Sequence, residues 1–112
     1  MIKRLGKQTS PLVPNPPIIK KTTSSSIVVT WEANEGDGRR GESLPVSGYI
    51  LRVLDADDGS EVTQQNHFKD KLKTSIKGLV PNARYQVQIA AVNALGASGY
   101  SVASETCATA SE

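Results

Sequence analysis

His67 is the residue on which nucleophilic or acid–base catalysis in this sequence would depend, because it is the only histidine in the chain. A hydrolytic site places a nucleophile within hydrogen-bonding reach of a base, and a third group orients that base. Ser60 and Ser75 are the conceivable nucleophiles, and Asp70 is the conceivable orienting group. No nucleophile-elbow motif surrounds His67, which lies in a polar connecting stretch. The sequence therefore predicts an exposed histidine and no catalytic residues.

The acidic residues and glycines of the sequence do not have the spacing that a metal-binding or phosphate-binding site requires. Four acidic residues lie close together: Asp55, Asp57, Asp58 and Glu61. They lack the Asp-x-Asp-x-Asp-Gly order of a calcium loop, so they predict a turn. The three glycines within 36–41 match GxGxxG, but no helix follows to receive a phosphate. Cys107 and His67 are too few for a zinc site, so we expect no metal and no cofactor.

The charge of the chain is nearly balanced, with 13 basic and 11 acidic residues and a formal net charge of +2. Dedicated nucleic-acid-binding domains are strongly basic, so this balance predicts no nucleic-acid partner. One alternative stays open at four nearby lysines: Lys69, Lys71, Lys73 and Lys77. A basic strip of this kind binds heparin, anionic lipid or nucleic acid with a steep salt dependence. Lysines that protect sheet edges from aggregation are the simpler interpretation.

No feature of the sequence assigns a cellular compartment. The basic start of the chain is not followed by the apolar run of a signal peptide, and no stretch is long and apolar enough to span a membrane. Cys107 is the only cysteine, which excludes a disulfide within the chain. The sequence also lacks an Asn-x-Ser/Thr glycosylation site. An intracellular parent protein is therefore allowed, and localisation stays unassigned.

Three segments alternate apolar and polar residues with the period of two that a half-buried β-strand requires. They are 26–31, 49–54 and 84–93. The expected inward faces are Ile27, Val29 and Trp31 in the first segment, Tyr49, Leu51 and Val53 in the second, and Tyr85, Val87, Ile89, Ala91 and Asn93 in the third. Their content of β-branched and aromatic residues also favours strands.

Four weaker segments complete the pattern: 18–20, 61–65, 72–77 and 100–109. In 72–77 we expect Leu72, Thr74 and Ile76 to point inward, while 32–47 is rich in glycine and charge and predicts a long loop. Seven short strands with turns between them and no amphipathic helix are typical of an all-β, immunoglobulin-like sandwich of antiparallel strands. We expect one domain over 15–110, after a flexible lead-in or linker at 1–14.

Several spacings resemble the fibronectin type III family. Trp31 ends the second predicted strand, and the segment 45–51 is similar to the proline, glycine and tyrosine that open the third strand in many members. The segment 79–85, Leu-Val-Pro-Asn-Ala-Arg-Tyr, resembles the family's Leu-x-Pro-x-x-x-Tyr corner, and 93–98 resembles the turn before the last strand. These matches span about 16 to 109.

The resemblance implies a structural core formed by five residues: Trp31, Tyr49, Leu79, Pro81 and Tyr85. It also implies that the hydroxyl of Tyr85 bonds to the backbone a few residues upstream, as in the tyrosine corner of immunoglobulin-like domains. Replacing Trp31 with alanine is expected to cost about 3 to 5 kcal/mol and to prevent folding, which would reveal nothing about a binding site.

Function is likewise an implication of the resemblance. We expect a non-catalytic protein-interaction or spacer module of a larger multidomain protein, of the adhesion, receptor, matrix or cytoskeletal type. Its partners would be other proteins and neighbouring domains of the same chain, and the isolated domain is expected to be a monomer. The alternative is an accessory or linker domain attached to an enzyme, with no binding role of its own.

The candidate partner-binding residues are Arg39, Arg40 and Glu42 in the long loop, with the turn at 94–99 as a second surface. Loops on a rigid scaffold carry much of protein recognition, and guanidinium groups bind carboxylates strongly and directionally. The tripeptide at 40–42 resembles the Arg-Gly-Asp integrin motif of one family member, but glutamate replaces aspartate, and the loop precedes the third strand rather than the seventh. Integrin binding is therefore not expected.

Overall fold

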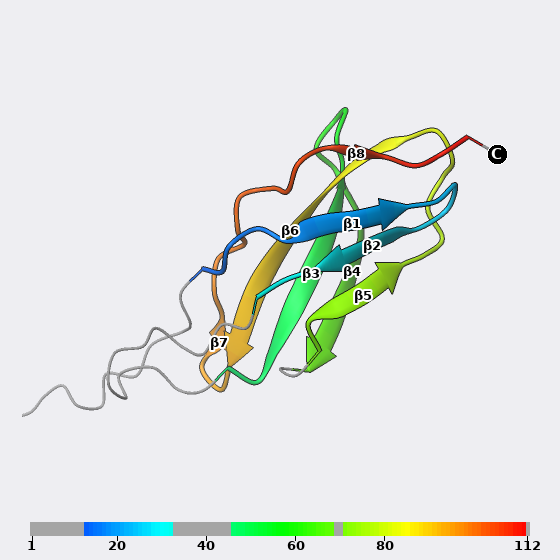
Figure 1. Cartoon of the computed structure of the whole chain (residues 1–112). Coiled ribbons are helices and arrows are strands. Elements are labelled where there is room, and N and C mark those ends of the chain that lie inside the picture. Colours follow the sequence, from blue (N-terminus) through cyan, green and yellow to red (C-terminus); the bar gives the residue numbers. More distant parts are fainter. Residues whose placement is uncertain (1–12, 33–45, 69–70, 112) are drawn as a thin grey trace, which may run out of the picture.

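The computed structural model describes residues 13–32, 46–68 and 71–111, and its strands form two antiparallel sheets that pack face to face (Figure 1). The smaller sheet has the order β1-β2-β5, with β1 at Ile18–Thr22, β2 at Ile27–Thr30 and β5 at Lys73–Ile76. Within these residues there is no helix, and so none that could cross a membrane.

The larger sheet has the order β4-β3-β6-β7, and β8 also pairs with β6. Its strands are β3 (Gly48–Asp55), β4 (Glu61–Phe68), β6 (Arg84–Asn93), β7 (Gly96–Ala97) and β8 (Cys107–Ala108). Every pairing in both sheets is antiparallel. The predicted all-β sandwich is therefore confirmed, with the last two strands only two residues long.

The core lies between the two sheets and is built by the alternating faces of β2, β3 and β6. Ile27, Val29, Leu51, Val87 and Ile89 are fully buried. These are the faces that the period of two predicts. At one end of the core the rings of Trp31 and Tyr49 meet edge to face, with centroids 6.0 Å apart, in the geometry that aromatic quadrupoles favour.

The tyrosine corner is present. The hydroxyl of Tyr85 accepts a hydrogen bond of 3.0 Å from the backbone N–H of Val80, which confirms the upstream bond that the resemblance implies. Leu79 is buried, Pro81 is half-buried, and Asn82 turns the chain with a φ of 55°. Asparagine tolerates this left-handed conformation better than most residues. The corner therefore fixes where the chain enters β6.

Three of the predicted strands differ clearly from the structure. β4 continues past Gln65 to Phe68, because its polar residues pair in register with β3 although their hydropathy does not alternate. In 72–77, Ile76 is buried as expected, whereas Leu72 lies before β5 and is 36% exposed. The expected strand at 100–109 is wrong except for β8. The preceding residues run beside β6 but bond to it at every third residue rather than at every second, as a strand would.

Gly48 is required by the close pairing of β3 with β4. A Cβ atom at this position would overlap the backbone carbonyl oxygen of His67, so the two strands would have to separate. We expect Gly48→Ala to lower the free energy of unfolding by about 1 to 3 kcal/mol, as overpacking does. Gly99→Ala is the control, because its Cβ would meet only the Val13 side chain, at 3.7 Å. Equal urea midpoints for the two variants would contradict this account.

Candidate functional site

The loop proposed as the binding site, with Arg39, Arg40 and Glu42, lies outside the described residues. The structure does show the residues that flank it. Trp31 on one side and Val46 on the other are each only 5% exposed. The points where the chain leaves and re-enters the sandwich are thus fixed by core packing.

The second predicted surface, the turn at 94–99, begins directly after β6 and contains β7. The carboxamide oxygen of Asn93 accepts the backbone N–H of Leu95 at 2.9 Å, and Gly96 has a φ of 137°, which glycine adopts easily. Leu95 is 53% exposed at this turn. Local hydrogen bonding therefore shapes the turn and leaves an apolar side chain accessible to a partner.

After this turn, residues 98–104 run along β6 as what we call the serine segment. Each of its three serines exchanges two hydrogen bonds with one residue of β6: Ser98 with Ala91, Ser101 with Ile89 and Ser104 with Val87. The serine N–H donates to the carbonyl at 2.7 to 2.8 Å, and the serine Oγ accepts the N–H at 2.9 to 3.1 Å. In an ordinary β-ladder the N–H groups of β6 would bond to backbone carbonyls of the neighbouring strand. Here the serine Oγ atoms accept those hydrogen bonds instead.

The period of the serine segment determines where its other residues lie. Three residues of the segment match two residues of β6, so the positions between serines do not alternate across the sheet as strand residues do. Val102 is 73% exposed, and Tyr100 lies over the outer face of β3. The spacing Ser-x-x-Ser-x-x-Ser in the sequence is the signal that could have predicted this arrangement.

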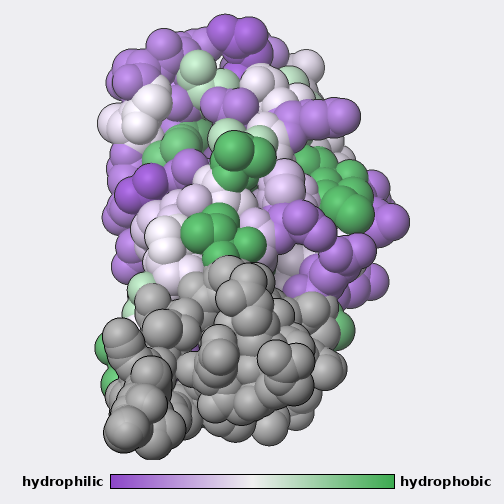
Figure 2. All heavy atoms as spheres, turned by 90° about the vertical axis from the view of Figure 1, so that its left-hand side faces the viewer, coloured by the Kyte–Doolittle hydropathy of each residue, from purple (hydrophilic) through white to green (hydrophobic). Residues whose placement is uncertain are grey.

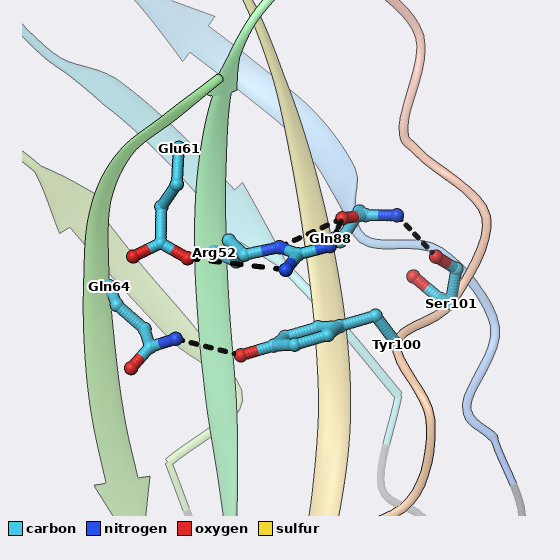
Figure 3. Close-up of polar contacts among 6 residues, drawn as sticks. All are labelled: Arg52, Glu61, Gln64, Gln88, Tyr100 and Ser101. Atoms are coloured by element: carbon cyan, nitrogen blue, oxygen red, sulfur yellow. Dashed lines mark hydrogen bonds and ion pairs between the residues drawn. The ribbon is translucent and has the colours of Figure 1, made fainter. Parts of the chain in front are cut away.

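Tyr100 is stacked on Arg52, in a group of side chains that we call the Arg52 cluster (Figure 3). The guanidinium carbon of Arg52 lies 4.1 Å from the centroid of the tyrosine ring, a cation–π contact. Gln64 on β4 donates to the Tyr100 hydroxyl at 2.9 Å. The ring is therefore held from its face and from its hydroxyl.

The rest of the Arg52 cluster comes from β6 and β4. Arg52 donates through Nε and Nη2 to the carboxamide oxygen of Gln88, at 3.1 and 2.6 Å, and Gln88 donates to the carbonyl of Ser101 at 3.0 Å. Glu61 approaches Arg52 at 4.0 Å. Figure 3 shows these side chains in one layer across β4, β3 and β6. The positive charge of Arg52 is therefore paired within the cluster, and the cluster forms an ordered polar surface on the outer face of the larger sheet.

Beside the Arg52 cluster the outer face of the larger sheet has a hollow of about 410 Å³. Gly48 contributes no side chain here, and it pairs with Phe68 on one side and Val92 on the other. Ile50 also lines the hollow, and Phe68 is 81% exposed. Figure 2 shows a different face, the one on the left in Figure 1, where hydrophobic groups form separate patches among hydrophilic ones.

His67 is half-buried on β4, although the sequence predicted an exposed histidine. Its ring lies 5.6 Å from the ring of Trp31, and its Nε2 lies 3.0 Å from the carboxamide oxygen of Gln65. Ser60 bonds instead to Asp58, and Ser75 lies on β5 opposite Val28. Asp70 is outside the described residues. The contacts of His67 are therefore those of a residue at the rim of the core.

Burial and the positive charge of Lys71 lower the pKa of His67 below its ordinary value of 6.5. The folded chain then binds this proton more weakly than the unfolded chain, so His67 costs no stability above pH 6.5 and destabilises the fold as the pH falls below it. We expect an NMR titration of the imidazole to have its midpoint below 6.5. His67→Gln should reduce the loss of unfolding free energy between pH 7.5 and 5, and an unchanged loss would contradict this assignment.

The acidic group forms a turn, as its sequence predicts. Asp55 accepts the N–H of Asp57 at 2.8 Å, and the two hydrogen bonds from Ser60 to Asp58 lower the pKa of that carboxyl. Arg84 pairs with Asp57 at the surface. In the described part of the chain, no three His, Cys, Asp or Glu residues gather as metal ligands would.

The thiol of Cys107 and the predicted lysine strip are both found in parts of the chain that the structure describes, except for Lys69. Cys107 is half-buried on β8, its Sγ donates to the carbonyl of Tyr85 at 3.5 Å, and burial raises its pKa, which makes the thiol less reactive. Lys73 begins β5 and Lys77 follows it, whereas Lys71 lies next to the end of β4, where its backbone N–H bonds to the carbonyl of Phe68 at 3.0 Å. All three lysines are exposed, and Lys69 is outside the described residues.

Comparisons with known proteins agree with this architecture. The family model for the fibronectin type III domain matches residues 12–106. Receptor-type tyrosine-protein phosphatase F of Bos taurus is 33% identical over 102 residues, which are 86% of this chain and 5% of that protein. Pikachurin of Rattus norvegicus is 30% identical over 101 residues, 88% of this chain and 10% of that protein. Receptor-type tyrosine-protein phosphatase S of Gallus gallus is 28% identical over 96 residues, 85% of this chain and 6% of that protein.

Solved structures show the same fold. The FN1-FN3 domains of chicken CNTN1 superpose with a TM-score of 0.73 at 25% identity, covering 90% of this chain and 33% of that one. The twitchin kinase region from C. elegans superposes with a TM-score of 0.75 at 23% identity, covering 93% of this chain and 17% of that one. The chain spans a tenth or less of the curated relatives. With the family model matching most of its length and the corner and sandwich in place, this chain belongs to the fibronectin type III domain family.

Proposed function

We propose that this domain is a protein-interaction or spacer module of a larger multidomain protein of the adhesion, receptor, matrix or cytoskeletal type. The observation that carries the proposal is the size of the match, which spans most of this chain but 5 to 10% of the curated relatives. A fibronectin type III domain is not itself a catalytic unit. The unit that we propose runs from 15 to 110, after a linker at 1–14.

The described side chains support a role in binding or spacing. Three polar side chains are held by their neighbours: Arg52 bonds to Gln88, Asp58 to Ser60, and His67 lies beside Gln65. A surface whose charges are paired in fixed geometry supports recognition by shape and by neighbouring loops. The partners that we propose are therefore other proteins and adjacent domains, with no nucleic acid and with the isolated domain a monomer in dilute solution.

Arg39, Arg40 and Glu42 stay our proposed contacts for a protein partner, at the loop whose ends are anchored by Trp31 and Val46. The test compares proteins captured from source lysate by the wild type and by Arg39→Ala/Arg40→Ala. Lys20→Ala/Lys21→Ala is the control, because it removes the same charge from exposed residues of β1. We expect a partner that the control retains and the loop variant loses. An identical set of captured proteins for all three would contradict binding through this loop.

The second candidate function is an accessory or linker domain attached to an enzyme. It is favoured by the names of the relatives, which include two receptor-type tyrosine-protein phosphatases, and by the twitchin kinase region among the structures of the same fold. Under this alternative no loop residue binds a partner. Deleting 15–110 from the parent protein would then change the activity of its catalytic domain, whereas replacing Arg39 and Arg40 would not.

A further inference from the structure

β4 forms one edge of the larger sheet, and in the described part of the chain no strand pairs with its outer side (Figure 1). An open strand edge accepts another extended chain unless lysine, proline or a bulge blocks it. Both edges of the smaller sheet are blocked, since β1 carries Lys20 and Lys21 beside a bulge and β5 begins with Lys73. The register of β4 with β3 shifts at Val62, but from Thr63 to Phe68 the strand has neither a bulge nor a lysine or proline.

The hydrogen bonds of β6 determine which groups of β4 point to this edge. The N–H and carbonyl of Ile89 bond to Ser101, so odd-numbered residues of β6 face the serine segment and even-numbered ones face β3. Backbone groups alternate in direction along each antiparallel strand, so the groups of Leu51 face those of Gln65. The backbone groups of Gln64 and Asn66 therefore point away from β3 and toward the open edge.

We infer that this edge is a docking site for a second copy of the chain, with the two β4 strands antiparallel and centred on Gln65. In that register Gln64 of each copy faces Asn66 of the other. Because both residues present their N–H and carbonyl outward, each facing pair exchanges two backbone hydrogen bonds. Residues that face each other also lie on the same side of the combined sheet, since both have even numbers.

The residues at the two ends of β4 are complementary to each other, which favours a second copy of the chain as the binding partner. Val62 and Phe68 are 45% and 81% exposed near opposite ends of the strand, and antiparallel pairing places Phe68 of one copy beside Val62 of the other. The charges are complementary as well, because Glu61 lies at one end of β4 and Lys71 follows the other. Glu61 is only loosely paired within its own copy, at 4.0 Å from Arg52, and 46% of its side chain is exposed to a partner. The antiparallel register brings each Glu61 near Lys71 of the second copy, whereas a parallel register would place like charges together.

The pairing is weak, because a single short edge buries less than the roughly 1,200 Å² of a stable interface. We expect a dissociation constant of about 0.1 to 1 mM, the range of a weak transient complex. The isolated domain is then a monomer in dilute solution. The edge acts where copies are concentrated, such as on a surface or in tandem arrays.

Sedimentation and amide chemical shifts of the chain from about 20 μM to 1 mM at low salt test the inference. We expect the sedimentation coefficient to rise and the amides of Gln64 and Asn66 to shift with concentration. Glu61→Lys and Lys71→Glu should each weaken pairing roughly 2- to 30-fold, because two exposed ion pairs are lost. The double variant Glu61→Lys/Lys71→Glu should restore it, and Phe68→Ser should weaken it.

Lys77→Glu is the matched control, because it changes the same charge beyond β5 rather than at the β4 edge. It should leave the pairing unchanged. A chain that sediments as a monomer with constant shifts up to about 1 mM overturns the inference. So does a dimer that Phe68→Ser and Glu61→Lys leave intact, or a double variant that stays as weak as the single ones.

Discussion

Replacing Trp31 with alanine lowers the free energy of unfolding by about 3 to 5 kcal/mol, the usual cost of truncating a large buried aromatic residue. Trp31 is 5% exposed, meets Tyr49 edge to face and packs against the ring of His67. The Nε1 of Trp31 makes no hydrogen bond within the described residues. The substitution therefore destabilises the domain by removing van der Waals contacts. Small domains have only about 5 to 15 kcal/mol of stability, so the variant is at the limit of folding.

Urea unfolding followed by far-UV circular dichroism measures this loss without relying on the tryptophan signal. Phe68→Ala is the matched control, because it also removes an aromatic ring but from a position that is 81% exposed. Its unfolding free energy should stay within about 0.5 kcal/mol of the wild type. A loss below about 1 kcal/mol for Trp31→Ala would mean that the end of the core is not packed as described.

The triple variant Ser98→Ala/Ser101→Ala/Ser104→Ala is the second large expected effect. Each substitution leaves one buried N–H of β6 without its acceptor, which costs about 1 to 3 kcal/mol. If the three costs add, the variant loses roughly 3 to 9 kcal/mol, although the side chains removed are small. The reason is that the serine Oγ atoms complete the ladder of β6, where Ser101 is 1% exposed.

Val102→Ala is the control within the same segment, because Val102 is 73% exposed and lies between two of the serines. Its urea midpoint should match that of the wild type. Hydrogen exchange gives a second readout, since in the single variant Ser101→Ala the amide of Ile89 should lose protection before those of β3. Retention of wild-type stability by the triple variant would show that the Oγ hydrogen bonds contribute nothing.

The sequence predicted the strands that have one face in the core. Arg84–Asn93 is predicted to the residue, because Tyr85, Val87 and Ile89 alternate with polar neighbours and nothing interrupts them. β4 was predicted too short, because an edge strand with polar residues on both faces carries no hydropathy period. Its pairing with β3 is determined by neighbours distant in sequence, so hydropathy alone does not reveal it.

The last strand and the Arg52 cluster were missed for one common reason. The valine and threonine content of 100–109 predicted a strand without a register, whereas the hydrogen bonds of Ser98, Ser101 and Ser104 impose a period of three. The position of Tyr100 over Arg52 depends on that period, so the stacking could not be predicted while the segment was assigned as a strand. Arg39, Arg40 and Glu42 stay a prediction from sequence.

We expect this chain to fold by itself into one cooperative module, and its single tryptophan makes that folding directly measurable. Equilibrium unfolding of the wild type in urea should be followed by Trp31 fluorescence and by far-UV circular dichroism in the same samples. We predict a blue-shifted native emission and one transition at which both signals coincide, with a slope of about 1 to 3 kcal/mol per molar urea. Emission typical of a solvent-exposed indole in buffer, or two transitions that do not coincide, would contradict the claim.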